Sequence, residues 1–67
     1  MKNNEDSIRV LYFLEYLIDE IEEYLEYIEN DEINIDNKIV ETLGNTSDML
    51  YKETRQMRRS IGLPHLV

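Results

Sequence analysis

Residues 10–28 read VLYFLEYLIDEIEEYLEYI, and this stretch decides the fold. Its apolar residues recur at alternating intervals of three and four positions, which is the spacing of a helix packed along its whole length. Asn3, Asn4, Asp6 and Ser7 precede the stretch and can cap such a helix. We therefore expect a helix over about residues 5–30, with this inward face: Leu11, Leu14, Ile18, Ile21, Leu25 and Ile28.

A second helix with the same periodicity follows a short polar segment. Residues 31–36 interrupt the apolar pattern, and Asp36 can cap the next helix. Gly62 can supply the left-handed residue that commonly ends a helix. We expect this helix over about residues 37–61, before a short apolar tail over 62–67, with this inward face: Val40, Leu43, Ser47, Leu50, Thr54, Met57 and Ile61.

Two helices of nearly equal length joined by a short connection predict an antiparallel hairpin, so the fold class is all-α. The 67 residues form one domain over positions 1–67, and a chain of this size buries only a small core. It has no cysteine with which to staple itself, which favours pairing of two hairpins into a four-helix bundle. Gly44 costs about 1 kcal/mol relative to alanine in a helix interior, so we expect a close approach of the other helix there, or a kink.

The outer surface of the first helix is unusually apolar. Tyr12, Phe13 and Tyr16 point away from the inward face, and exposed aromatic groups of this kind mark interfaces. The alternative is that the tyrosines tolerate water and only Phe13 requires cover. We predict an interface with a second copy or with another protein, formed by Val10, Tyr12, Phe13, Tyr16, Leu17 and Tyr24.

Charge is distributed unevenly along a chain whose net charge is -8. Residues 1–36 hold twelve acidic and two basic residues, whereas residues 37–67 hold five basic and three acidic residues. In a hairpin the end with the connection is then acidic and the end with the termini is basic, which favours an antiparallel homodimer. The acidic face comprises Glu15, Asp19, Glu22, Glu23, Glu26 and Glu29, and the basic patch comprises Lys52, Arg55, Arg58 and Arg59.

These charges carry two further expectations. Glu15, Glu22 and Glu29 repeat every seven residues and are expected to face water. The basic patch is expected either to compensate the negative end of its helix and nearby acids such as Glu15, or to contact an acidic partner.

The acidic surface repels phosphate backbones, so direct binding of nucleic acid is not expected. The leading hypothesis is a small non-enzymatic interaction protein that binds and regulates or inhibits another protein. Its carboxylates would imitate the charge of a nucleic acid and occupy a basic nucleic-acid-binding protein. Such a protein would act as an inhibitor or antirepressor of the kind found in phages and mobile elements.

The alternative is a small Mg²⁺-dependent enzyme that uses helix carboxylates. Residues 22–26, Glu-Glu-Tyr-Leu-Glu, resemble the EExxE metal-binding segment of all-α nucleotide pyrophosphatases of the MazG type. That resemblance implies nucleotide hydrolysis. The chain departs from the family in its second acidic motif, where the string that begins at Glu41 ends in Asn45 instead of an acid.

Two families of helical hairpins resemble the expected shape. The small two-helix aspartyl-phosphate phosphatases match in length, and Asp48 falls where their motif places an acid, but residues 44–47 depart from the rest of that motif. The Rop family of RNA-binding hairpin dimers is similar in architecture alone, because its function requires a surface that suits RNA. Phosphatase activity is therefore retained only within the enzymatic alternative.

Cofactors, metal ions and catalytic residues are not expected. The chain has no cysteine, its only histidine is His65 near the end, and its only glycines are Gly44 and Gly62, so thiolate, Ser–His and glycine-rich phosphate sites are excluded. No stretch approaches the roughly 20 apolar residues of a membrane span. The polar first residues lack the apolar core of a signal peptide, and we expect a cytoplasmic protein.

Overall fold

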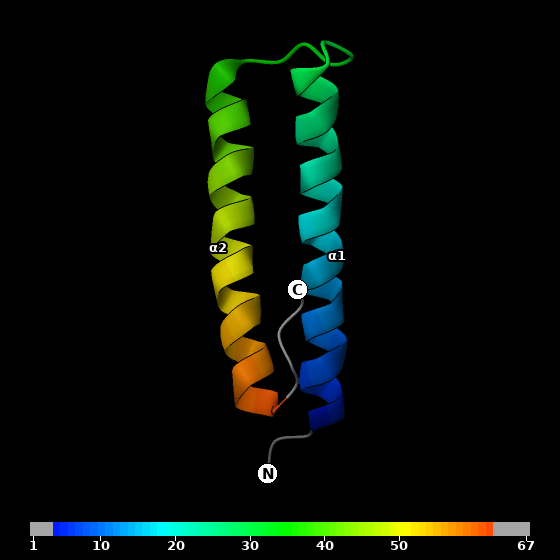
Figure 1. Cartoon of the computed structure of the whole chain (residues 1–67), viewed down its shortest axis with the longest axis vertical. Coiled ribbons are helices and arrows are strands. Elements are labelled where there is room, and N and C mark those ends of the chain that lie inside the picture. The colour runs from blue at the N-terminus through cyan, green and yellow to red at the C-terminus, as the bar shows by residue number, and fades with distance from the viewer. Residues whose placement is uncertain (1–3, 63–67) are drawn as a thin grey trace.

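The computed structural model describes residues 4–62, which form two helices, α1 (Asn4–Glu29) and α2 (Asn37–Ile61). They run antiparallel and side by side, with the connection at one end of the rod (Figure 1). The predicted all-α hairpin is thus confirmed, and no strand occurs in the part of the chain that the structure describes. The proposed cap at Asn3 and the apolar tail beyond Gly62 lie outside the described residues.

The inward face of α1 makes a thin core. Leu11 is fully buried and Ile18 is 4% exposed, whereas the other apolar residues of the stripe are only half-buried. A helix has a single neighbour in a hairpin, so solvent reaches both sides of the stripe. The side chains that share this half-buried position on α1 are Leu14, Ile21, Leu25 and Ile28.

Small polar residues fill the middle of the facing stripe on α2. Ser47 and Thr54 are buried, as their place on the predicted inward face requires. The Thr54 hydroxyl donates to the Tyr51 carbonyl oxygen at 3.1 Å, so this buried polar group keeps a hydrogen bond. Small side chains at these positions allow the larger residues of α1 to approach the seam between the helices.

Both predicted caps of α2 are confirmed. The Asp36 carboxylate accepts a hydrogen bond of 2.9 Å from the Lys38 backbone N–H, which satisfies one of the donors at the helix start. Gly62 has φ 91°, and its N–H donates to the Arg58 carbonyl oxygen at 2.9 Å. A positive φ is the conformation in which glycine is favoured over other residues.

Helix α1 ends in a Schellman motif that the sequence did not reveal. Asp31 has φ 62°, and its N–H donates to the Ile28 carbonyl oxygen at 3.1 Å. The Glu32 N–H donates to the Tyr27 carbonyl oxygen at 2.9 Å, which completes the pattern. Because Asp enters the left-handed region more readily than most residues, this motif needs no glycine and leaves a weak signal in the sequence.

The expected close approach at Gly44 is wrong. A Cβ atom added to this residue would meet no atom within 4 Å, and α2 continues as one helix from Asn37 to Ile61. The missing side chain therefore leaves open space beside the seam, and the structure shows no packing that requires a glycine here.

Replacing Gly44 with alanine should stabilise the hairpin. Alanine is favoured over glycine in a helix interior by about 1 kcal/mol, and the added methyl group has room. In a protein of this size that gain raises the melting temperature by about 4–8 °C. Thermal unfolding followed by circular dichroism at 222 nm would measure the change.

The matched control is Gly62→Ala, the same substitution at a positive φ. It should destabilise the protein by about 1–2 kcal/mol, because a Cβ is strained in the left-handed conformation. If Gly44→Ala lowered the melting temperature as Gly62→Ala should, the assignment of open space at Gly44 would be refuted.

Candidate interaction surfaces

The hairpin has two long flanks, one on each side of the seam, and they differ in chemistry. In α1, residues seven apart lie on the same side, which groups Val10, Leu17 and Tyr24. Because the helices are antiparallel, Ile39 and Met49 of α2 lie on that same side, together with the polar residues Thr46 and Glu53. We call the apolar residues of this side the apolar flank: Val10, Phe13, Leu17, Tyr24, Ile39 and Met49.

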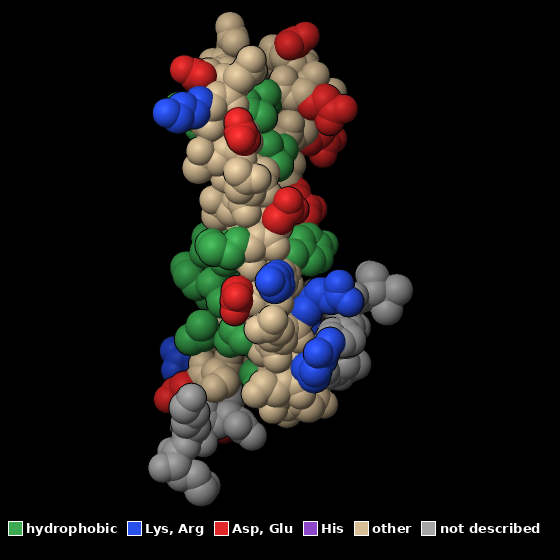
Figure 2. Space-filling view, turned by 90° about the vertical axis from the view of Figure 1, so that its left-hand side faces the viewer, with side chains coloured by type: hydrophobic (Ala, Val, Ile, Leu, Met, Phe, Trp, Pro, Cys, Tyr) green, Lys and Arg blue, Asp and Glu red, His purple; other side chains and the backbone are tan. Residues whose placement is uncertain are grey.

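The apolar flank is open to solvent. All of its side chains are exposed except Leu17, which is half-buried. Val10 and Phe13, with Asp6 and Arg9, line a shallow hollow of about 350 Å³. Figure 2 shows hydrophobic side chains gathered along one edge of the half of the rod that lies away from the connection, opposite a group of Lys and Arg side chains.

The structure divides the predicted interface residues. Four of the six, Val10, Phe13, Leu17 and Tyr24, lie together on the apolar flank. Tyr16 lies on the outer side of α1, turned away from the seam, and Tyr12 lies towards the opposite flank, on the side of Arg58. All of these residues except Leu17 are strongly exposed, with Phe13 and Tyr16 each 57% exposed.

The opposite side of the seam is acidic. Helix periodicity places Asp19, Glu22 and Glu26 of α1 on this side, facing Glu41 and Asp48 of α2. The Lys38 and Lys52 side chains of α2 instead project from its outer side. We call this surface the carboxylate flank, and its members are all exposed: Asp19, Glu22, Glu26, Glu29, Glu41 and Asp48.

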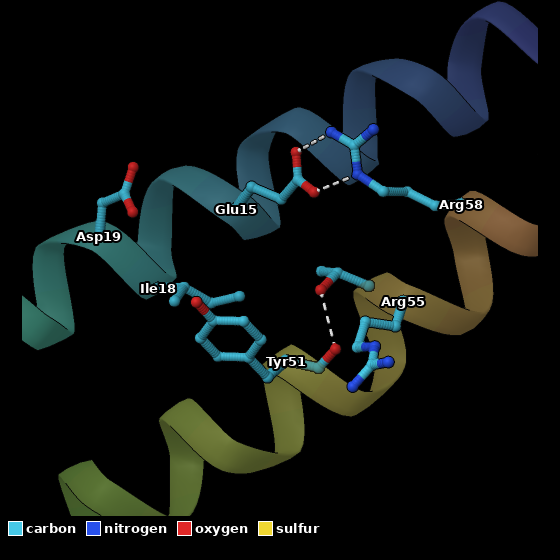
Figure 3. Close-up of a pocket in the computed structure, with 7 residues that line it drawn as sticks. Glu15, Ile18, Asp19, Tyr51, Arg55 and Arg58 are labelled. Carbon is cyan, nitrogen blue, oxygen red and sulfur yellow. Dashed lines mark hydrogen bonds and ion pairs between the residues drawn. The ribbon is translucent and has the colours of Figure 1, made fainter. Parts of the chain in front are cut away.

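At the end of the carboxylate flank nearer the termini, an ion pair joins the helices. Arg58 donates two hydrogen bonds to the Glu15 carboxylate, from Nε to Oε2 at 2.6 Å and from Nη2 to Oε1 at 2.7 Å (Figure 3). The side chains are only 9% and 16% exposed, respectively. The expectation that Glu15 faces water is therefore wrong, whereas its compensation by the basic patch is observed.

The geometry of this pair explains its electrostatics. The hydrogen bonds to Glu15 raise the pKa of Arg58, and the charge of that carboxylate adds to the effect against the opposing cost of burial. A two-point contact between guanidinium and carboxylate also fixes the relative positions of the two helices. The rest of the basic patch, Lys52, Arg55 and Arg59, is exposed.

Beside the ion pair lies a hollow of about 330 Å³ between the helices. Ile18 of α1 and the Tyr51 ring of α2 supply its apolar lining (Figure 3). Thr54 also lines the hollow. Asp19 and Arg55, one from each helix, also line the hollow, and both side chains are exposed. Periodicity alone did not single out this hollow, because Tyr51 and Arg55 lie outside the predicted inward face.

The enzymatic alternative gains no support from these positions. Glu22 and Glu26 share the carboxylate flank, but Glu23 lies on the outer side of α1, where it accepts a hydrogen bond of 2.5 Å from the Tyr27 hydroxyl. Among residues 4–62, no group of three or more His, Cys, Asp and Glu side chains is arranged to hold a metal ion. Of the EExxE string, Glu22 and Glu26 thus lie on one side of α1 and Glu23 lies on another.

No protein-family model matches this chain, and no curated protein or solved structure matches it. Neither α1 nor α2 contains a segment that is both long enough and apolar enough to cross a membrane.

Removal of the Glu15 charge should destabilise the hairpin. Glu15→Gln leaves the mostly buried Arg58 guanidinium without its carboxylate, and we expect the melting temperature to fall by several degrees. The control is Glu22→Gln, the same change one heptad later at an exposed position. Thermal unfolding should distinguish the two variants, and an equal effect would show that the ion pair contributes nothing specific.

The Tyr27 phenol should ionise at unusually high pH. Its hydrogen bond to Glu23, together with the negative charge of that carboxylate, raises the pKa from 10.0 to about 12. Since the folded-state pKa is raised, the contact stabilises the fold below pH 10 and is lost as the pH rises through about 12.

Absorbance at 295 nm during a pH titration would measure this ionisation. Glu23→Gln should return the pKa of Tyr27 towards its ordinary value, and Tyr27→Phe should remove the component that titrates last. A wild-type curve whose five tyrosines all ionise near pH 10 would contradict the contact.

Proposed function

We propose that this protein is a non-enzymatic interaction protein that pairs with itself through the apolar flank and, as a dimer, binds and regulates another protein. The observation that carries the proposal is the exposure of the apolar flank in a hairpin with only two fully or nearly fully buried apolar side chains in its described part, Leu11 and Ile18. A core this small favours assembly as the source of further stability.

Burial supplies the driving force for pairing. Covering the exposed half of a large apolar side chain contributes about 1 kcal/mol, and the flank presents five such side chains along one side of the rod. Two apolar flanks facing each other would form a four-helix bundle whose second seam resembles the first. An isologous contact of this kind needs only one surface, which meets its own copy.

Charge favours an antiparallel arrangement of the two hairpins. The end of the rod at the connection carries Glu29, Asp31 and Glu32, whereas the other end carries Arg9, Arg55 and Arg59 next to Glu5 and Asp6. An antiparallel dimer brings the acidic end of one copy near the basic end of the other, and a parallel dimer would place like charges together. The two-fold arrangement would therefore bury the apolar flanks and also bring opposite charges together.

The regulated partner is proposed to be a basic protein. A net charge of -8 and an exposed carboxylate flank favour association with a positively charged surface and disfavour nucleic acid itself. Rows of carboxylates at helical spacing can stand in for the phosphates of a nucleic acid. The proposed role is thus inhibition of a protein whose basic surface otherwise binds DNA or RNA.

Phe13→Asp should weaken self-association, because it places a charge in the centre of the proposed dimer contact. The loss of one buried aromatic anchor typically weakens binding about 30-fold or more. Size-exclusion chromatography with multi-angle light scattering, run over a series of concentrations, would show the variant dissociating where the wild type stays dimeric.

Tyr16→Asp is the matched control for this experiment. Phe13 and Tyr16 are equally exposed aromatic residues of the same helix, but Tyr16 lies on its outer side. The Tyr16 variant should remain a dimer. A wild-type protein that is monomeric at every concentration, or two variants that dissociate alike, would overturn the proposed dimer.

A further inference from the structure

We infer that the groove between the carboxylate flank and the seam is the docking site for the regulated protein, and that it takes a lysine- or arginine-rich amphipathic helix with one large apolar anchor side chain. The inference rests on the proposed function and assigns the partner's contact to a defined place. The proposed site also predicts which carboxylates contribute to binding of the partner. Attraction by net charge alone would make no such distinction.

The anchor site is the hollow beside the ion pair. Its volume of about 330 Å³ has an apolar wall formed by Ile18 and the Tyr51 ring, against which an apolar side chain can pack, and its other lining residues are polar or charged. The Glu15–Arg58 pair closes one end of the hollow with groups that already satisfy each other. An incoming side chain therefore need not separate these charges.

The rims of the groove select a cationic partner. From the hollow towards the connection, α1 contributes Asp19, Glu22 and Glu26, and α2 contributes Asp48 and Glu41. Acidic side chains thus stand on both sides, so a basic helix lying between them meets opposite charge on each side. Gly44 adds open space on the α2 side of the same stretch.

The charges also set the direction in which the partner's cations extend. Arg55 lines the hollow one helical turn nearer the termini than Tyr51, and further positive charge is repelled there. Towards the connection, the last turn of α1 has no basic residue and carries Glu26 and Glu29 at the negative end of the helix dipole. Cationic side chains there relieve an unfavourable arrangement, so we place them on the connection side of the anchor.

The groove remains open in the proposed dimer. The apolar flank and the carboxylate flank lie on opposite sides of the seam, so a second copy that covers the first leaves the second exposed. Docking and dimerisation therefore use separate surfaces and can be tested separately.

A synthetic peptide provides the probe for the test. It is a fluorescently labelled amphipathic helix of lysine, alanine and leucine with a single tryptophan anchor, and its affinity for the full chain is measured by fluorescence anisotropy. Two control peptides replace either all lysines with glutamate or the tryptophan with alanine. The lysine peptide should bind, the glutamate peptide should not, and the alanine peptide should bind at least about tenfold more weakly.

Two protein variants with the same net charge locate the contact. Glu22 and Glu23 are neighbouring exposed residues, but Glu22 lies on the carboxylate flank and Glu23 on the outer side of α1. Glu22→Lys should weaken peptide binding at least about fivefold more than Glu23→Lys does. Raising NaCl from about 50 to about 200 mM should weaken wild-type binding as well.

Tyr51→Ala tests the hollow in the same assay, with Tyr16→Ala as its control. Only the Tyr51 variant should reduce the advantage of the tryptophan peptide over the alanine peptide. In a ¹⁵N-resolved NMR spectrum of the complex, the Gly44 amide should shift more than the Gly62 amide, because Gly44 borders the groove.

The outcomes separate this inference from the proposed function. Equal losses with Glu22→Lys and Glu23→Lys would mean attraction by net charge alone, and an absence of peptide binding would mean no docking groove; either result overturns the inference while a dimer seen by light scattering persists. If Glu22→Lys dissociated the dimer, the groove would hold a second copy and the inference would also be overturned.

Discussion

A pair of helices can bury only the seam between them, and this geometric limit governs the whole molecule. Each helix has one neighbour, so only a stripe one or two side chains wide is buried. Both edges of that stripe remain exposed to solvent. Leu11 and Ile18 show how little interior results. Everything beyond the seam must be stabilised by polar contacts that span the helices or by another molecule. The hairpin uses the first solution on one side and presents an apolar surface on the other.

That division gives the two flanks different roles. On one side, Arg58 and Glu15 form a polar bridge between the helices, and carboxylates continue from it towards the connection. On the other side, Phe13 and its apolar neighbours expose hydrophobic surface that makes no directional contacts. An apolar surface without directional contacts suits a permanent, self-complementary partner. A charged groove suits a partner that is attracted over a long range and released by salt. The proposed dimer and the proposed docking site follow from this contrast.

The sequence predicts the features that depend on periodicity or on a single residue type. The three-and-four spacing of apolar residues located both helices, and Asp36 and Gly62 marked the ends of α2 because caps require particular side chains. It did not predict contacts that depend on how the helices are placed against each other. Glu15 has the same heptad position as the exposed Glu22, and only the position of Arg58 across the seam sets it apart. The space at Gly44 is likewise a property of the helix separation, which no local pattern records.

The ends of the rod close in different ways, and this sets an order of folding. At the connection, the Schellman motif and the Asp36 cap join residues that are close in sequence, so they form at little entropic cost. The Glu15–Arg58 bridge joins residues 43 positions apart and must wait until the intervening chain has been drawn together. The two helices should therefore pair first near the connection and last near the termini, and they should separate in the reverse order on unfolding. Its aromatic end, where Phe13 lies, would then be the last part to become ordered, and in the proposed dimer this step would coincide with the contact between the two copies.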